Sequence, residues 1–182
     1  FARMPSPKFE TIDAMEMLRQ GVFAQRVASP EVDVELLEGP EYYTLVCDNH
    51  MIGQAMTNLL KNAAEAIAAR HAEGPGAPKG RITAQLIEEG SYVSLVVEDN
   101  GAGLPPRDRD RLTEPYVTTR EKGTGLGLAI VKRIMEDHGG ALLLADAARG
   151  RGARFSLRFP RPEFKVEQPK LRQARLAMKE AE

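Results

Sequence analysis

The sequence has no tryptophan, a single cysteine and few aromatic residues, with 4 tyrosines and 6 phenylalanines among 182 residues. One cysteine cannot form a disulfide within the chain, which excludes a fold held together by disulfides. Cys47 lies in the apolar run 43–47, so we interpret it as an inert core thiol in a reducing compartment. No apolar stretch approaches the length of a membrane span and no signal peptide is visible, so we expect a soluble, cytosolic protein.

Neither sign of charge dominates, because 25 basic residues face 26 acidic ones and leave a net charge of −1. Without a basic stripe or interleaved aromatic residues, the composition argues against a nucleic-acid partner. The length suits one domain that buries a core without disulfides or metal ions. Because the chain begins with Phe1 and not with methionine, we expect a fragment of a longer protein.

Composition divides the chain into three parts: a proline-containing linker at 1–7, a domain at 8–160 and a charged tail at 161–182. Asp13 predicts a helix N-cap, with Glu16 completing a capping box. Residues 100–122 follow neither helical nor strand periodicity and predict an active-site lid. The remaining patterns predict strands at 9–12, 32–37 and 42–47, helices at about 13–27 and 49–71, a hairpin at 81–88 and 92–98, a helix after residue 128, and a closing hairpin at 141–145 and 153–159. This order predicts a two-layer α/β sandwich and not a doubly wound fold.

The predicted helix 49–71 has two distinct faces. Its apolar face comprises Ile52, Met56, Leu59, Leu60, Ala63 and Ile67. Its polar face comprises Asn58, Lys61, Asn62 and Glu65. Such a face is ordinarily solvated, and on this helix alone that interpretation is favoured. Asparagine is a poor helix former, however, and its amide oxygen is a suitable ligand for Mg²⁺.

A glycine-rich turn, residues 123–128, runs directly into an apolar-patterned helix. The residues are Gly123, Thr124, Gly125, Leu126, Gly127 and Leu128. Glycines let the backbone approach an anion, and the first helical N–H groups point at it, so the turn predicts a phosphate site. A turn that only starts a helix remains the alternative, and Thr124 fits either as an anion donor or as an N-cap. The spacing is neither that of a P-loop nor that of a dinucleotide fingerprint.

Four segments in this order resemble the motifs of the GHKL nucleotide-binding superfamily, which joins gyrase B, heat-shock chaperone ATPases, MutL and sensor histidine kinases. Residues 58–66 resemble the N box, 96–105 the G1 box, 114–119 a histidine-kinase F box and 123–128 the G2 box. The opening residues and the run 58–67 are most similar to nitrogen-regulation sensor kinases of the NtrB/NtrY type. The resemblance covers about residues 5–160.

The resemblance implies the Bergerat fold, a mixed sheet covered by helices on one face, with ATP held between the helices and a mobile lid. It implies that Asn62 is the Mg²⁺ ligand and that Asp99 accepts a hydrogen bond from the adenine amine. Gly101 and Gly103 would let the backbone and lid lie close to the base. Asn58 stands where hydrolysing members carry a glutamate general base.

Several further residues join the expected nucleotide site by resemblance. Lys61 belongs to the N box, and Thr119 to the F box. Tyr116 takes the position of an aromatic lid anchor. Arg120 and Lys122 are candidate cations for the β- and γ-phosphates, with a plain surface role equally open.

Two departures from the family pattern concern nucleotide contacts. Glu65 stands where many histidine kinases carry a lysine, which leaves open the cation that meets the γ-phosphate. Ala153 stands in the last glycine box where a hydroxyl residue is common, which puts one water contact near adenine in doubt.

His50, His71 and His138 are followed by Met51, Ala72 and Gly139, so none lies in a phosphoacceptor motif. His138 is explained by a helix C-terminus. We therefore expect an ATP- and Mg²⁺-dependent catalytic domain of a sensor histidine kinase that acts on a histidine in its own, absent dimerisation domain.

The expected downstream partner is a response regulator, and a homodimer is expected only in the full-length protein, which can be anchored in the inner membrane. The rival hypotheses are a GHKL ATPase and a non-catalytic nucleotide-sensing or docking module. A GHKL ATPase would need a glutamate near the position of Asn58, and the sequence has none there. The presence of Asn62, Asp99 and the glycines argues against a non-catalytic module.

Overall fold

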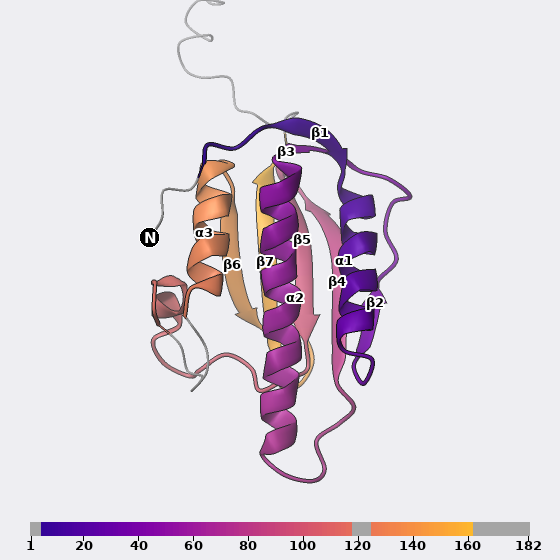
Figure 1. The fold of residues 1–182 in the computed structure, drawn as a ribbon, viewed down its shortest axis with the longest axis vertical. Coiled ribbons are helices and arrows are strands. Elements are labelled where there is room, and N and C mark those ends of the chain that lie inside the picture. The colour runs from indigo at the N-terminus through magenta and orange to yellow at the C-terminus, as the bar shows by residue number, and fades with distance from the viewer. Residues whose placement is uncertain (1–4, 118–124, 162–182) are drawn as a thin grey trace, which may run out of the picture.

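The computed structural model describes residues 5–117 and 125–161 and shows a five-stranded sheet with all its helices on one face (Figure 1). The strand order is β2-β4-β5-β7-β6. The strands are β2 (Asp33–Leu36), β4 (Arg81–Glu89), β5 (Tyr92–Asp99), β6 (Ala141–Asp146) and β7 (Ala153–Pro160). The helices are α1 (Ala14–Ala28), α2 (Asn49–Ala72) and α3 (Gly127–Asp137). The predicted two-layer α/β sandwich is confirmed.

The sheet is mixed, because β2 pairs with β4 in parallel and the other neighbours pair antiparallel. The two remaining strands, β1 (Glu10–Asp13) and β3 (Thr44–Cys47), form a separate antiparallel pair with Thr11 opposite Val46. The predicted lid segment contains a short 3₁₀ helix, η1 (Arg109–Thr113).

Alternation along the central strands places the core between the sheet and the helices. On β4, Ile82 and Ala84 are fully buried, and their neighbours on β5 fill the same layer. Helix α2 lies over the middle of the sheet (Figure 1). Its predicted apolar face is confirmed, because all six side chains are at most 2% exposed. This burial fixes the rotation of α2, so its polar face turns away from the core.

The N-terminus of α2 is a second fixed point. The Asp48 carboxylate accepts hydrogen bonds from the backbone N–H groups of Met51, at 2.9 Å, and Lys8, at 2.7 Å, and these bonds lower the pKa of Asp48. Next to it, Cys47 is fully buried, and the loss of water contact raises the pKa of its thiol to about 12. The interpretation of Cys47 as a core thiol agrees with this position.

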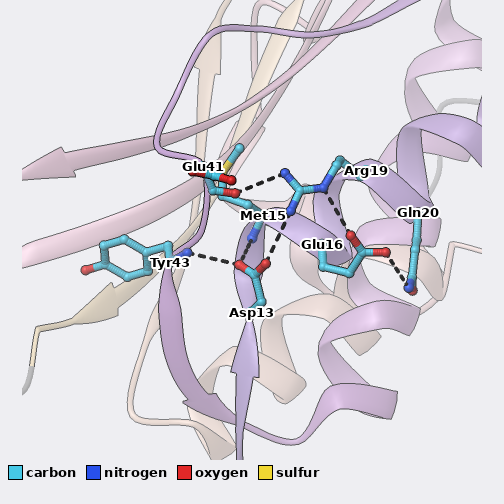
Figure 2. Close-up of polar contacts among 7 residues, drawn as sticks. All are labelled: Asp13, Met15, Glu16, Arg19, Gln20, Glu41 and Tyr43. Carbon is cyan, nitrogen blue, oxygen red and sulfur yellow. Dashed lines mark hydrogen bonds and ion pairs between the residues drawn. The ribbon is translucent and has the colours of Figure 1, made fainter.

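Asp13 caps α1, as predicted, by accepting a hydrogen bond from Met15 N–H at 3.0 Å (Figure 2). The same carboxylate accepts from Tyr43 N–H at 2.9 Å, and these bonds lower its pKa. The expected capping box is wrong in its second half. The two oxygens of Glu16 accept from Arg19 and Gln20 on the helix surface (Figure 2), because those longer side chains lie within reach one turn on.

His138 joins the ends of two helices. Its Nδ1 lies 2.7 Å from the Ile134 carbonyl at the end of α3, and its Nε2 accepts a hydrogen bond from Asp48 N–H at 2.9 Å. The Phe9 ring lies edge-on against it, with ring centroids 5.1 Å apart. His138 is the C-cap residue of α3, the helix end at which it was expected, and its ring contacts join that end to the N-terminus of α2.

The predicted domain limits stay predictions, since residues 1–4 and 162–182 lie outside the described part of the chain. Among the described helices, none is both long and apolar enough to cross a membrane.

Candidate functional site

A cavity of about 420 Å³ opens between α2, the segment after β5 and the start of α3. It gathers residues from parts of the chain far apart in sequence. Its polar wall comes from α2, its floor from the end of β5 and from β7, and its remaining sides from the lid segment and α3. The residues lining it include Gln54, Asn58, Lys61, Asn62, Glu65, Ala66, Asp99, Gly103, Leu104, Pro105, Leu112, Val117, Gly125, Leu126, Gly127, Leu128, Ile130, Ala153 and Phe155.

The wall contributed by α2 is its predicted polar face. Asn58 and Asn62 lie one helical turn apart, both half-buried, and both line the cavity. Lys61 is the most exposed of this group, at 72%, and its Nζ lies 3.9 Å from Glu65 Oε1. The structure therefore places the asparagines against a cavity rather than on an open solvated surface.

Asp99 ends β5 at the bottom of the cavity with 3% of its surface exposed. Its Oδ1 accepts a hydrogen bond from Gly101 N–H at 2.8 Å, which fixes the carboxylate in a tight turn. An ionised carboxylate has only acceptor oxygens, so at the floor of the cavity it can accept a hydrogen bond from a ligand that offers an N–H group.

Gly101 does not line the cavity, although it was expected to lie near the base. A Cβ at this position would stand 2.5 Å from the carbonyl carbon of Ala66 on α2. The next residue, Ala102, donates its N–H to the Ala66 carbonyl at 2.9 Å. Glycine is required here because the turn packs directly against the backbone of α2. Gly103 does line the cavity, as expected.

The described part of the glycine-rich turn also lines the cavity. Gly125, Leu126, Gly127 and Leu128 all line it, and a Cβ at Gly127 would lie 3.8 Å from Asn62 Nδ2. The N-cap position of α3 is occupied by Leu126, and Thr124, for which an N-cap role was the alternative, lies outside the described residues.

The lid segment approaches this turn through its backbone. Tyr116 N–H donates to the Gly125 carbonyl at 3.0 Å, and Tyr116 has a left-handed φ of 64°. Its side chain is 69% exposed and does not line the cavity, so the expected aromatic anchor is not formed here. Leu112 and Val117 supply the lid's apolar contacts instead. Thr119, Arg120, Lys122, Gly123 and Thr124 lie outside the described residues.

Apolar residues that sequence reasoning did not select complete the cavity, among them Leu104, Ile130 and Phe155. Phe155 pairs with Val97 on the side of the sheet that faces the helices. Strand alternation along 153–159 was the available signal, since it puts Phe155 on the same face as the core residue Leu157. Such walls suit a flat aromatic ring.

Residues 47–163 match the family described as histidine kinase-, DNA gyrase B-, and HSP90-like ATPase. The chain belongs to this family. The matched region contains α2, Asp99 and α3, and thus every described wall of the cavity. Both the predicted superfamily and its fold are confirmed.

Relatives and solved structures narrow the comparison to sensor kinases. The nitrogen regulation protein NtrY of Azorhizobium caulinodans is 48% identical over 170 residues, covering 93% of this chain and 21% of that protein. A mycobacterial sensor histidine kinase, MprB, superposes with a TM-score of 0.69 at 28% identity, covering 84% of this chain and 99% of that one.

A second solved structure, full-length ShkA in complex with AMPPNP, gives a TM-score of 0.71 at 26% identity, covering 87% of this chain and 32% of that one. The chain thus resembles the ATP-binding catalytic domains of NtrY-like sensor histidine kinases. It spans about a fifth of the length of the curated relative it matches.

Proposed function

We propose that this domain binds MgATP and transfers the γ-phosphoryl group to a histidine on a separate domain of a two-component sensor kinase. The observation that carries the proposal is the convergence on one cavity of a buried carboxylate, Asp99, an asparagine pair, Asn58 and Asn62, and the start of α3 at Gly127. These are the three kinds of group needed for a base, a metal-bound triphosphate and its oxygens.

The adenine end of the proposed site is the bottom of the cavity, where Asp99 lies. The carboxylate would accept from the exocyclic amine, and the apolar wall that includes Leu104, Ile130 and Phe155 would enclose the ring. Gly103 would permit close approach of the backbone, since its φ is 83°. That ShkA was solved with AMPPNP supports an adenine nucleotide as the ligand.

The phosphate end is formed by α3 and α2. The first N–H groups of α3, beginning at Gly127, have no earlier helical turn to bond to and would face phosphate oxygens. Asn62 lies across from Gly127, so its amide oxygen fits a Mg²⁺ ion held between the helix and the phosphates. When bound, Mg²⁺ would neutralise phosphate charge. Lys61, Thr119, Arg120, Lys122, Gly123 and Thr124 remain proposed contributors to this end.

Asn58 distinguishes a kinase from an ATPase in this proposal. It lines the cavity one turn before Asn62, and its neutral amide cannot remove a proton from water. Water is then not activated, and an imidazole nitrogen presented from another domain attacks the γ-phosphorus. As that bond forms, the bond to the bridging oxygen breaks and ADP leaves with its electron pair. The domain contributes position and charge rather than a nucleophile.

We propose that the acceptor histidine lies on another domain, because none of the three histidines of this chain lies in a phosphoacceptor motif and two of them already have hydrogen-bond partners. His71 Nε2 lies 2.9 Å from the Pro78 carbonyl, and both nitrogens of His138 have partners. His50 and His71 lie near opposite ends of α2, about 30 Å apart along the helix.

We propose that the intact protein is a homodimer that passes the phosphoryl group to a response regulator, with this domain in the cytoplasm.

The chain alone, incubated with γ-labelled ATP and Mg²⁺, is expected to bind ATP without labelling itself and with only slow hydrolysis. Adding the parent protein's dimerisation domain should produce acid-labile label on a histidine of that domain. Calorimetry and a labelling time course are the measurements. Brisk steady-state hydrolysis would favour the ATPase alternative, and absence of ATP binding would sink both.

Replacing Asn62 by alanine is expected to weaken ATP binding in Mg²⁺ about tenfold or more, because a ligand of the ion is lost. Binding measured in EDTA should change little, because the adenine contacts remain. Asn58→Ala is the matched control on the same face one turn earlier, and its effect should be milder. If Asn62→Ala leaves the Mg²⁺ dependence unchanged, the metal assignment is wrong.

A further inference from the structure

The turn after Asp99 is held by hydrogen bonds to three different segments. Asn100 N–H donates to the Arg81 carbonyl at 3.2 Å, and Ala102 N–H donates to α2 as described above. The Asn100 carbonyl accepts from Arg70 Nη1 at 2.5 Å. The Ala102 carbonyl accepts from Arg151 Nε at 2.8 Å. The position of the Asp99 carboxylate therefore depends on side chains that lie outside the cavity.

Arg151 makes the contact with the longest reach in sequence. It lies in the turn between β6 and β7, 49 residues from Ala102, and its two terminal nitrogens each contact an oxygen of Glu73 at 2.6 Å. This forked contact lowers the pKa of Glu73 and raises that of Arg151. A two-bond contact fixes the plane of the guanidinium, and with it the direction of the Nε–H that meets Ala102.

The same turn touches the end of β5 directly. Gly152 lies so close that a Cβ there would stand 1.8 Å from the Asp99 carbonyl oxygen. The side chain of Arg151 also lies near Gly103, where a Cβ would be 3.8 Å from Arg151 Cγ. The β6–β7 turn, the end of α2 and the Asp99–Gly103 turn thus form one connected unit.

We infer that Arg151, held by Glu73, is a positioning residue for adenine recognition by Asp99. This inference rests on the proposed function, because it concerns the ligand that Asp99 accepts. Arg151 does not line the cavity, and it acts by fixing the Ala102 carbonyl and so the turn in which Gly101 N–H orients Asp99 Oδ1. Glu73, the C-cap residue of α2, completes the unit, and α2 also carries Asn62.

The test compares ATP and GTP binding by the wild type, Arg151→Ala and Glu73→Gln. Arg151→Ala is expected to weaken ATP about three- to tenfold and to change GTP less, so that the ATP-to-GTP preference falls by a similar factor. Glu73→Gln should also lower the ATP-to-GTP preference, but by a smaller factor. Arg151→Lys should recover only part of the preference, because lysine keeps the charge but not the fork.

The matched control is Glu16→Gln. Glu16 contacts Arg19 at 3.1 Å, and this pair is similarly exposed, but both of its residues lie on α1. It should leave nucleotide preference unchanged. If Arg151→Ala weakens ATP and GTP equally, or matches the control, the positioning role is overturned while wild-type ATP binding still supports the proposed function. A wild type that binds no ATP overturns the function itself.

Discussion

ATP is expected to bind this domain at least about a hundredfold more tightly than GTP, a difference of about 2–3 kcal/mol. Asp99 is 3% exposed at the floor of the cavity and has only acceptor oxygens when ionised. Guanine would set its carbonyl oxygen against that carboxylate, leaving two buried acceptors facing each other. Calorimetric titration with both nucleotides under the same Mg²⁺ concentration measures the difference.

The conservative variant for this expectation is Asp99→Asn. It keeps the shape of the side chain and an oxygen for Gly101 N–H, now accepted at 2.8 Å, while turning an amide donor toward the base. ATP should lose most of its advantage, so that the ratio of the two affinities falls below about ten. Comparable wild-type affinities for ATP and GTP would remove Asp99 from the adenine site.

Gly152→Ala is expected to lower the free energy of unfolding by more than about 3 kcal/mol. The added methyl group would stand 1.8 Å from the Asp99 carbonyl oxygen, and the φ of 152° at this residue disfavours any side chain. Neither backbone can move easily to relieve this clash. Asp99 is a paired residue of β5, and the Gly152 carbonyl accepts a hydrogen bond from Ala147 N–H at 3.1 Å. Chemical denaturation measures the loss.

Gly150→Ala supplies a control in the same turn. Gly150 has a φ of 72°, and a Cβ there would have nothing within 4 Å. Only the backbone cost of about 1–2 kcal/mol is expected. Equal destabilisation by the two substitutions would mean that the contact between the β6–β7 turn and Asp99 contributes nothing beyond backbone conformation.

Local patterns were enough to predict most of the secondary structure. The predicted hairpin 81–88 and 92–98 became β4 and β5, and the apolar face of α2 is buried as its spacing requires. These signals survive because each strand or helix is long enough to show its period several times. The end of β5 and the start of α3 were likewise predictable from their turn residues.

Pairings between distant segments were not predictable. Strand β1 pairs with β3 across the whole of α1, and β2 lies parallel to β4 across the whole of α2. No local period encodes such a choice of partner. The same reason applies to Arg151, which lies between the two strands of the predicted closing hairpin and whose guanidinium contacts Glu73 and Ala102 from 78 and 49 residues away.

Lid contacts were the hardest to predict. Tyr116 was expected to be an aromatic anchor of the lid, yet its backbone makes the contact to Gly125 and its ring is exposed. Gly125 permits this because a Cβ there would stand 2.6 Å from the Tyr116 carbonyl carbon. The motifs name both segments, but nothing in the sequence predicts which of their atoms meet.

Helix α2 contributes residues to both the adenine end and the phosphate end of the proposed site. The Ala66 carbonyl holds the turn beside Asp99, and Asn62 and Asn58 follow at four-residue steps of about 6 Å each toward the N-terminus. Asp48 and the apolar face stop the helix from sliding or rotating. The number of helical residues between Ala66 and Asn62 therefore sets the distance between the adenine end and the Mg²⁺ end of the proposed site. One residue inserted between Asn62 and Ala66 would turn the two asparagines by about 100° relative to the Asp99 turn.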